Sequence, residues 1–484
     1  MKQVLIRVHQ FLGTALSILF VMWFLTGFVM IYHNFPKMQE SVQRHALYSL
    51  KAIPRDSLEV NLKTLVPQVK PDSLSLRMFS DSVYGFSYSL GGKTTLYPSE
   101  GKPRDRYTLK EVDLYAKRAF SAPIIYVDTL HYLDRWIPYE KHLEQMPILR
   151  YHYGDESRTE LYVSQVTGEG VQYSTESSRF YAWIGAIPHW LYILDLRFYR
   201  DTWANIVITV SGLGAFMCLS GLILGGMAYI KRYRKRKDFR SMYPKGVFRW
   251  HHIAGFIFGI FVFSFSFSGM MSLQKIPQWL VSTHRPELST LSQDRSIQIA
   301  PSDYPLSIGQ LLSQLSSKEV LKVSFRSYGE KPYYQVLTAD TTIFVDASEA
   351  QAKPLKLDSI DVKRWVDALH PQEKYTIILL KEYDNYYINK KQNLPLPVFH
   401  VQVEDKDKTS YYIDPKTASV RYFNRNTRLR QWTYQALHSF TFKGLVGHGI
   451  GWNILMFTAM IGGTIVSCTG LVLAWRYLRK RKTR

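Results

Sequence analysis

The sequence predicts an α-helical membrane protein with four spans, built by tandem duplication, together with two α+β domains that face water. Four apolar runs of about twenty residues are each long enough to cross the hydrocarbon core of a bilayer. Long polar stretches, residues 34–186 and 275–430, follow the first and the third run. Residue types beside the runs recur at a constant spacing, which indicates an internal repeat.

The duplication is visible in two sets of residues that recur along the chain. At an offset of 242, Arg7, His9, Gly13 and Gly27 recur as Arg249, His251, Gly255 and Gly269; at an offset of 249, His189, Trp203, Gly214 and Gly221 recur as His438, Trp452, Gly463 and Gly470. Each copy therefore carries two histidines at fixed places beside apolar runs.

The positive charge of the chain gathers at two places. The formal net charge is +22 over 484 residues. Residues 231–249 hold nine Lys and Arg with one Asp, and residues 476–484 hold six with no acid. Both clusters directly follow apolar runs, as basic residues do on the cytoplasmic side of membrane proteins. We therefore expect a bilayer as the partner of this charge and exclude nucleic-acid binding.

The first apolar run, residues 11–32, is an uncleaved span, because it is too long for a signal peptide and no small-residue cleavage site follows it. Later spans are expected near residues 206–230, 253–273 and 454–477. The divisions are a first span with a cytoplasmic amino terminus (1–33), a first outer domain (34–186), an interfacial segment with the second span (187–231), a basic cytoplasmic loop (232–250), the third span (251–274), a second outer domain (275–430), an interfacial segment with the fourth span (431–477) and a basic cytoplasmic tail (478–484).

The outer domains show mixed α and β patterns. In the first, residues 75–90 and 93–98 predict strands around a Gly-Gly turn, 108–120 a helix, and 160–174 a hairpin turning at Thr167-Gly168. Similar patterns occupy the matching places of the second domain, residues 320–327, 333–347, 361–370 and 409–423. Each outer domain is therefore expected to be a compact α+β unit.

Histidines and glycines share faces of the predicted spans. At 100° per residue, His9, Gly13 and Gly27 fall within about 40° of one another, and the second copy repeats this with its equivalents. Glycines alone favour close helix packing. An ionisable group at a span end, however, usually has a function, and an imidazole beside a glycine stripe offers an axial ligand and room for a flat porphyrin ring.

A bundle with a pseudo-twofold axis along the membrane normal brings equivalent histidines face to face. We expect two bis-histidine haem sites: His9 with His251 at the inner end and His189 with His438 at the outer end, with His252, His33 and His448 as alternates. About 27 Å of helix separates His9 from Gly27, so two haems per chain are expected rather than one. Of the adjacent pair His251 and His252, only His251 keeps the four-residue spacing to Gly255.

Other sequence motifs narrow the function. The chain shows no phosphate-binding loop, dinucleotide fingerprint, HExxH or CxxC pattern. Its two cysteines, Cys218 and Cys468, lie within apolar runs and are expected to be small hydrophobic residues. We therefore expect any electrons to be delivered by another molecule.

Several short motifs together resemble the PepSY-associated transmembrane family. They are the RxHxxxG openings at Arg7 and Arg249, the pairs Thr26-Gly27 and Ser268-Gly269, the IDPKT turn at 413–417 and the LHSF sequence at 437–440. The resemblance covers essentially the whole chain. It implies four spans and PepSY-like domains in the periplasm. Members include iron-regulated inner-membrane proteins and ferric-siderophore reductases, which hold two b-type haems through histidines.

The sequence departs from the family pattern at the turns. The Asp-Pro-x-Thr-Gly turn survives as residues 414–418 without its glycine, and the first copy, residues 164–168, lacks the Asp-Pro. Some relatives carry a fused flavoprotein module, whereas this sequence ends at the basic tail. These departures leave the four histidines unchanged.

Three functions remain in competition. The first is a haem oxidoreductase of the bacterial inner membrane, which passes electrons from an unidentified donor to ferric iron or a ferric siderophore in the periplasm. The second is a non-redox PepSY protein that binds or regulates a peptidase. The third is a metal-chelate transporter, since duplicated halves often build transporters. The presence of haem in the purified protein separates the first from the other two.

Overall fold

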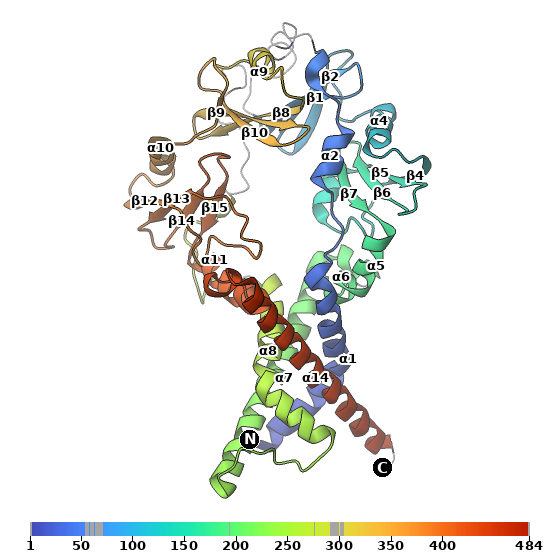
Figure 1. The fold of residues 1–484 in the computed structure, drawn as a ribbon, viewed down its shortest axis with the longest axis vertical. Helices are drawn as coiled ribbons and strands as arrows, with labels where there is room; N and C mark the ends of the chain where they lie inside the picture. The colour runs from blue at the N-terminus through green and yellow to red at the C-terminus, as the bar shows by residue number, and fades with distance from the viewer. Residues whose placement is uncertain are drawn as a thin grey trace.

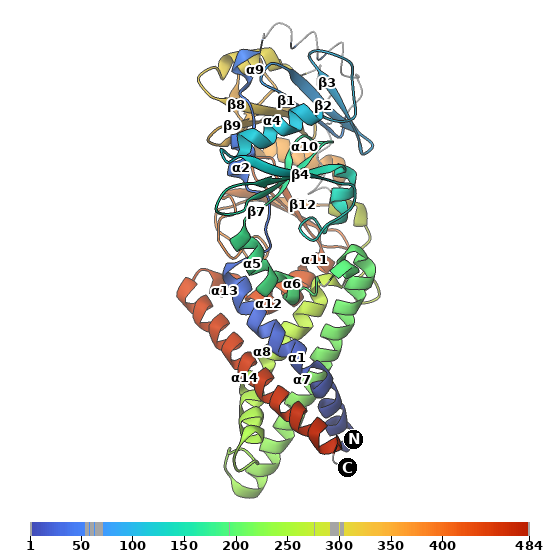
Figure 2. The ribbon, with the colours of Figure 1, turned by 90° about the vertical axis from the view of Figure 1, so that its right-hand side faces the viewer.

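The protein consists of a helical stem with two lobes at one end of it, as the computed structural model shows (Figures 1 and 2). The structure describes residues 2–53, 58, 62, 71–192, 194–274, 276–290, 300 and 304–482. Residues 483 and 484 of the expected basic tail, and parts of both expected outer domains, lie outside the described residues. The four expected haem-ligand histidines lie within them.

Four long helices form the stem. They are α1 (Lys2–Tyr32), α7 (Arg200–Arg236), α8 (Val247–Leu273) and α14 (Gly449–Lys482). Among the described residues, these four are long and apolar enough to cross a membrane. Each contains one of the spans expected from the sequence. The prediction of a multi-pass membrane protein with four spans is therefore confirmed.

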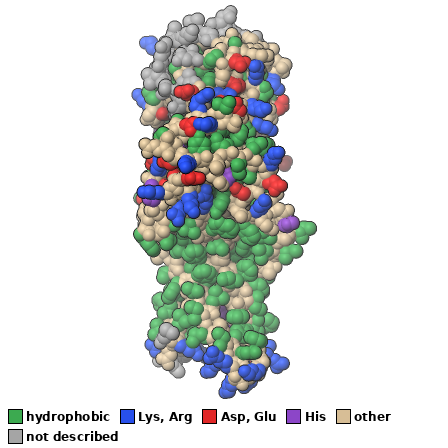
Figure 3. All heavy atoms as spheres, turned by 90° about the vertical axis from the view of Figure 1, so that its left-hand side faces the viewer, with side chains coloured by type: hydrophobic (Ala, Val, Ile, Leu, Met, Phe, Trp, Pro, Cys, Tyr) green, Lys and Arg blue, Asp and Glu red, His purple; other side chains and the backbone are tan. Residues whose placement is uncertain are grey.

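The surface of the stem is apolar along most of its length. Figure 3 shows a belt of hydrophobic side chains below the lobes and a cluster of Lys and Arg side chains at the far end. Phe11, Ile18, Ile257 and Ile461 are each more than half exposed. A continuous exposed apolar surface of this kind indicates contact with lipid rather than with water.

Two of the repeated glycines serve helix packing. A Cβ atom at Gly463 would lie 2.0 Å from the ring of Phe24, and one at Gly214 would lie 2.8 Å from the ring of Phe20. Both phenylalanines belong to α1 and are almost fully buried. Small residues here let α7 and α14 approach α1 closely, as expected for packing in a membrane.

Each lobe contains a four-stranded antiparallel sheet. In the first lobe the order is β4 (Ile124–Leu130), β5 (Ile148–Tyr153), β6 (Glu160–Ser164) and β7 (Gly170–Ser174). In the second it is β12 (Tyr375–Leu380), β13 (Val398–Val403), β14 (Ser410–Ile413) and β15 (Val420–Phe423). The duplication seen in the sequence is therefore also a duplication of structure.

One helix packs beside each of these sheets, and both helices begin in the same way. Helix α4 (Leu109–Ala119) starts at a capping box of Thr108 and Glu111, in which side chains satisfy the free backbone N–H groups of the first turn. Helix α10 (Ser359–Leu369) starts at the equivalent box of Asp358 and Asp361. The expected helix over residues 108–120 is present within one residue at each end.

The remaining strands join the two lobes in one sheet. The strands β1 (Ser73–Met78), β2 (Tyr84–Leu90) and β3 (Lys93–Pro98) come from the first copy, and β8 (Val320–Tyr328), β9 (Lys331–Thr338), β10 (Thr342–Asp346) and β11 (Lys353–Pro354) from the second. They form one seven-stranded sheet in the order β11-β10-β9-β8-β1-β2-β3. The two copies meet where β1 pairs antiparallel with β8, with Leu76 opposite Val323.

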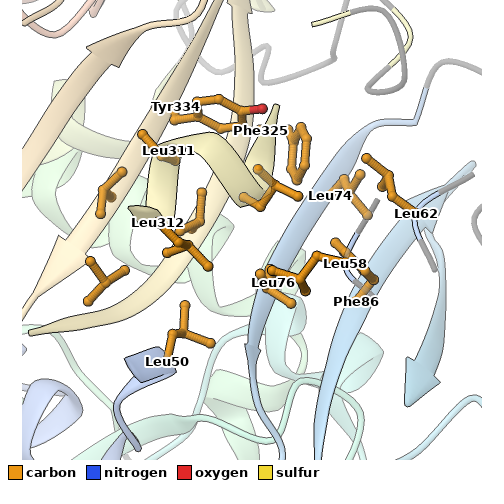
Figure 4. Close-up of a cluster of buried hydrophobic side chains, with 14 of the residues drawn as sticks. Leu50, Leu58, Leu62, Leu74, Leu76, Phe86, Leu311, Leu312, Phe325 and Tyr334 are labelled. Carbon is orange, nitrogen blue, oxygen red and sulfur yellow. The ribbon is translucent and has the colours of Figure 1, made fainter. Parts of the chain in front are cut away.

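This shared sheet differs from the two separate outer domains expected from the sequence. Its core mixes side chains of both copies (Figure 4), with Leu74, Leu76 and Phe86 from the first and Leu311, Phe325 and Tyr334 from the second. The physical reason is edge pairing: β1 and β8 each have an open edge, and pairing the two edges satisfies both rows of backbone groups. The lobes are therefore joined at the end far from the membrane.

A partly buried ion cluster reinforces the joint. The Glu169 carboxylate accepts a hydrogen bond from Arg77 at 3.0 Å and one from Lys322 on β8 at 2.6 Å. Burial favours the neutral acid, but the two cations outweigh this and hold the pKa of Glu169 at about 2. An ion pair therefore crosses between the two copies.

Short helical segments connect the lobes to the stem. On the first copy these are α5 (Glu176–Ile184), α6 (Ala186–His189) and η3 (Leu194–Phe198). On the second they are α11 (Arg425–Arg430), a π-helical turn η6 (Gln431–Ala436), α12 (Leu437–Ser439) and α13 (Lys443–Val446). Two of the expected ligand histidines lie on these connectors, at the outer ends of the spans.

Candidate functional site

The two inner histidines face each other within the stem. His9 lies on α1 and His251 on α8, and both rings are half-buried. Their ring centres are 6.4 Å apart and their planes are inclined at 47°. The structure thus brings together the inner pair that the duplication predicted.

The two outer histidines also face each other. His189 ends α6 and His438 lies on α12, so both come from the connectors rather than from the spans. Their ring centres are 6.4 Å apart and their planes are inclined at 70°. Each pair combines equivalent residues of the two copies, and the two pairs have the same separation.

This separation suits one metal ion between two imidazoles. A metal–imidazole bond is about 2 Å long, and the ring centre lies roughly 1 Å behind the bonded nitrogen, so ligands on opposite sides have centres about 6 Å apart. Among the described residues, no group of three or more His, Cys, Asp or Glu side chains gathers for a metal. At this distance two imidazoles could hold one metal ion between them.

At the outer pair, a hydroxyl from a neighbouring span holds each ring. The Oγ1 atom of Thr26 lies 3.0 Å from Nδ1 of His189, and Oγ of Ser268 lies 3.0 Å from Nδ1 of His438. Thr26 donates its hydroxyl proton to the Met22 carbonyl at 2.8 Å, and Ser268 donates to a carbonyl of its own helix. A hydroxyl has one proton, so each oxygen accepts from Nδ1–H of the histidine.

The inner pair is held in the same way from α7 and α14. Nδ1 of His9 lies 3.0 Å from the Met217 carbonyl and 3.2 Å from Ser220 Oγ. A carbonyl only accepts, so Nδ1 carries the proton. Nδ1 of His251 lies 3.0 Å from Oγ1 of Thr469, which donates its own proton to the Ile465 carbonyl at 2.7 Å.

All four histidines therefore share one tautomer. The proton is on Nδ1, which leaves the lone pair on Nε2 as the ligand atom. Hydrogen bonds of this kind fix the orientation of metal-binding histidines and raise their basicity. The four rings are thus neutral and have an unprotonated Nε2, which could bind a metal.

Two duplicated tryptophans hold the outer connectors in place. Nε1–H of Trp203 on α7 donates to the Trp190 carbonyl at 2.8 Å, one residue after His189. In the second copy, Nε1–H of Trp452 donates to the carbonyl of the residue after His438, also at 2.8 Å. Each tryptophan therefore fixes the backbone beside one outer ligand.

Two further glycines of the repeated stripe leave room for the inner rings. A Cβ atom at Gly221 would lie 2.6 Å from Cε1 of His9, and one at Gly470 would lie 3.4 Å from Cε1 of His251. At the outer end, a Cβ at Gly27 would lie 3.6 Å from Cε1 of His189. The glycine stripe therefore serves both helix packing and the histidine sites.

Comparison with known proteins agrees with this architecture. A family model described as PepSY-associated TM region matches residues 6–370 and, a second time, residues 248–484. The chain belongs to the PepSY-associated transmembrane family. The second match begins 242 residues after the first (248 against 6), which is the offset found between the inner histidines. No curated protein matches the chain.

The alternate ligands of this PepSY-associated protein lie outside the two pairs. His252 stacks on Tyr229 at 4.6 Å, and its Nδ1 lies 3.0 Å from Ser241 Oγ. His33 stacks on Tyr181 at 3.6 Å. His448 is exposed near the start of α14. The geometry therefore favours His251 over His252 at the inner pair and gives the other two no facing imidazole.

Sequence reasoning missed the residues that orient the histidines in this family member. Thr26 and Ser268 were seen only as part of a motif, and Ser220 and Thr469 were not singled out. A signal was present, since Thr26 and Ser268 share the offset of 242, and Ser220 and Thr469 share that of 249. A hydroxyl that recurs in both copies one residue before a repeated glycine is a sign of a shared role.

Proposed function

We propose that this PepSY-associated membrane protein holds two b-type haems and passes electrons through the stem to ferric iron or a ferric siderophore on the side of the lobes. The observation that carries this proposal is the facing of two histidine pairs, each with ring centres 6.4 Å apart. His9 and His251 would hold the inner haem, and His189 and His438 the outer one.

The residues present fit a haem. The donor set at each site is two neutral imidazoles with Nε2 free, and a glycine lies beside the rings of His9, His251 and His189. A haem held by two imidazoles would supply one-electron transfer. A metal ion without a porphyrin, in contrast, is usually held by three or four protein ligands.

The chain's own residues position and shield the two sites. Thr26 and Ser268 hold the outer rings, and Ser220 and Thr469 hold the inner rings. Between the two levels, aromatic side chains of α1 and α8 fill the interior; Phe24 and Phe265, for example, lie with ring centres 6.0 Å apart. This packing excludes water from the middle of the stem.

The two sites lie at different depths. His9 and Thr26, which contacts His189, are separated by about 25 Å of helix at 1.5 Å per residue. Transfer between the two levels therefore moves an electron across most of a hydrocarbon core of about 30 Å. A single site could not serve both faces of the membrane.

The proposed direction of electron transfer follows from the positions of the basic residues. The basic ends of α7 and α14 are proposed to lie in the cytoplasm, following the positive-inside rule. Both termini are then cytoplasmic and the lobes lie in the periplasm of a bacterial inner membrane. Electrons would enter from a separate, unidentified donor at the basic end and leave toward a ferric chelate near the lobes.

The proposal is tested with purified full-length protein from haem-replete cells. After anaerobic reduction with dithionite and removal of excess reductant, a ferric siderophore or ferric citrate is added in the presence of a ferrous-iron indicator. We expect the reduced haem bands to disappear while ferrous iron is formed in stoichiometric amount. A colourless protein, or a reduced haem that ferric chelates leave unchanged, would contradict the proposal and favour a non-redox role.

A further inference from the structure

Arg197 is a buried cation with no anionic partner among the residues that the structure describes. It lies on η3 and is 7% exposed. Its guanidinium carbon lies over the rings of Trp203, Tyr192 and Tyr139, at 4.6, 5.2 and 5.4 Å. Its Nε atom is buried without a hydrogen-bond partner in the part of the chain that the structure describes.

Such an arrangement is unusual for a buried charge. Aromatic rings attract a desolvated cation that lies over their faces, but they accept none of the five N–H groups of arginine in the plane of the guanidinium. Buried charges in proteins are normally paired and hydrogen-bonded. The aromatic cage therefore holds a guanidinium that is able to bind a further anion.

The position of Arg197 links it to the outer histidine pair. The ring of Trp203 lies beneath the guanidinium, and Nε1–H of the same tryptophan donates to the carbonyl after His189. The Trp203 side chain thus contacts Arg197 with its ring face and the backbone of Trp190, the residue next to His189, with its indole N–H. An anion at Arg197 would lie beside the outer site rather than elsewhere on the lobe.

The second copy has a cation at the equivalent tryptophan. The Lys390 ammonium lies 3.8 Å from the ring centre of Trp452, whose Nε1–H holds the backbone after His438. Desolvation lowers the pKa of Lys390. In the described residues this ammonium forms no ion pair.

The two cations did not arise from the duplication itself. Arg197 corresponds to Val446 at the offset of 249, and Lys390 corresponds to Glu140 at the offset of 250. One cation comes from a connector and the other from a loop between β12 and β13. Each repeated tryptophan therefore has a cation on its ring face, although the two cations come from different elements. This indicates that both outer histidines require a positive charge nearby.

We propose that Arg197 and Lys390 bind the carboxylates of the porphyrin held between His189 and His438. The inference rests on the proposed function and adds to it an anion site for the cofactor. A b-type haem carries two propionate groups, and the faces of the two repeated tryptophans carry two cations. Arg197 is the stronger of the two, because its planar fork of N–H groups matches a carboxylate. A lipid phosphate is the other anion available at this depth.

The test is a redox titration of the haem-loaded full-length protein. Arg197→Gln leaves a carboxylate uncompensated, which stabilises the ferric state, so we expect the midpoint potential of the outer haem to fall while the inner haem stays unchanged. Lys390→Gln should produce a smaller fall, since Lys390 is more exposed. Arg197→Lys should restore part of the potential. Arg200→Gln is the matched control, because that exposed arginine pairs with Glu140.

The outcomes separate this inference from the proposed function. A colourless wild-type protein overturns both. If the proteins contain haem but the midpoint potential of the outer haem is the same in Arg197→Gln, Lys390→Gln and the wild type, the carboxylate site alone is overturned. To distinguish a lipid phosphate, thermal stability is compared after His189→Ala has removed the outer haem. The stability loss caused by Arg197→Gln is measured both in the wild-type background and in the His189→Ala background. If the loss is the same in both, the anion is not the porphyrin and the inference fails.

Discussion

Thr26 on α1 and His189 on α6 are joined by a hydrogen bond of 3.0 Å that sets the tautomer of the histidine. The Thr26 hydroxyl donates its proton to the Met22 carbonyl on α1, so its oxygen accepts a hydrogen bond from Nδ1–H of His189. The Nε2 atom of His189 therefore carries no proton. The same relation recurs between Ser268 and His438. The Thr-Gly and Ser-Gly pairs at the outer ends of two spans are therefore positioning elements for the outer site.

The first prediction concerns this hydroxyl. Thr26→Val keeps the shape of the side chain but removes the acceptor for His189. Loss of such a partner typically weakens metal binding about 10–100-fold, so we expect loss or weakening of the outer haem and an unchanged inner haem, measured by haem titration. Thr14→Val is the control, because Thr14 bonds only to the Gln10 carbonyl of its own helix. Equal haem affinity in both variants would contradict the assigned role of Thr26.

The second prediction concerns space at the inner site. Gly221→Ala places a Cβ atom 2.6 Å from Cε1 of His9, whose ring is held by Met217 and Ser220. We expect the inner haem to be lost or shifted in its spectrum and the outer haem to remain. Gly226→Ala on the same helix meets open space and should behave as the wild type. The measurement is the reduced-minus-oxidised spectrum of each variant.

The third prediction separates two neighbouring histidines. His251 faces His9, whereas His252 stacks on Tyr229 and contacts Ser241. His251→Ala should remove one haem of two, and His252→Ala should remove none. If the two variants behaved in the opposite way, the register of α8 against α1 in this account would be wrong by one residue.

The fourth prediction concerns the joint between the lobes. The pKa of Glu169 is lowered to about 2, so its contribution to stability is complete above the unfolded value near 4.5 and is lost as pH falls toward 2. Glu169→Gln leaves Arg77 and Lys322 without their anion and should cost roughly 2–3 kcal/mol at neutral pH.

Thermal unfolding at several pH values measures this effect. The wild type should lose stability between pH 5 and 3 more steeply than Glu169→Gln, because the variant has no carboxylate to protonate there. Glu176→Gln is the control, since the Glu176 pair with Arg158 is largely exposed and contributes little. A variant with the same pH profile as the wild type would show that the cluster does not hold the lobes together.

The helices and the histidine pairs could be predicted because their signals are local or duplicated. Four apolar runs determine four spans, and constant offsets relate His9 to His251 and His189 to His438. The helix over residues 108–120 and the turn at Gly168, where φ is +62°, were also predicted from the sequence. Each of these depends on a few neighbouring residues.

The shared sheet could not be predicted in this way. Pairing of β1 with β8 depends on two open strand edges that lie more than 200 residues apart in the sequence. The alternation of apolar residues in a strand does not indicate which other strand it pairs with. The tautomers also required structure, because they depend on where the protons of Thr26 and Thr469 are donated. Arg197 could not be recognised as a candidate binding residue, because its aromatic surroundings come from residues that only the fold brings together.

The central claim is that two haems are each held by one duplicated pair of histidines. A pyridine haemochrome assay on the wild type and on His9→Ala, His251→Ala, His189→Ala and His438→Ala tests it most directly. We predict two haems per chain in the wild type and one in each variant, with His9 and His251 losing the same haem and His189 and His438 the other. A wild type without haem, or a variant of one pair that loses the haem of the other pair, would contradict the account.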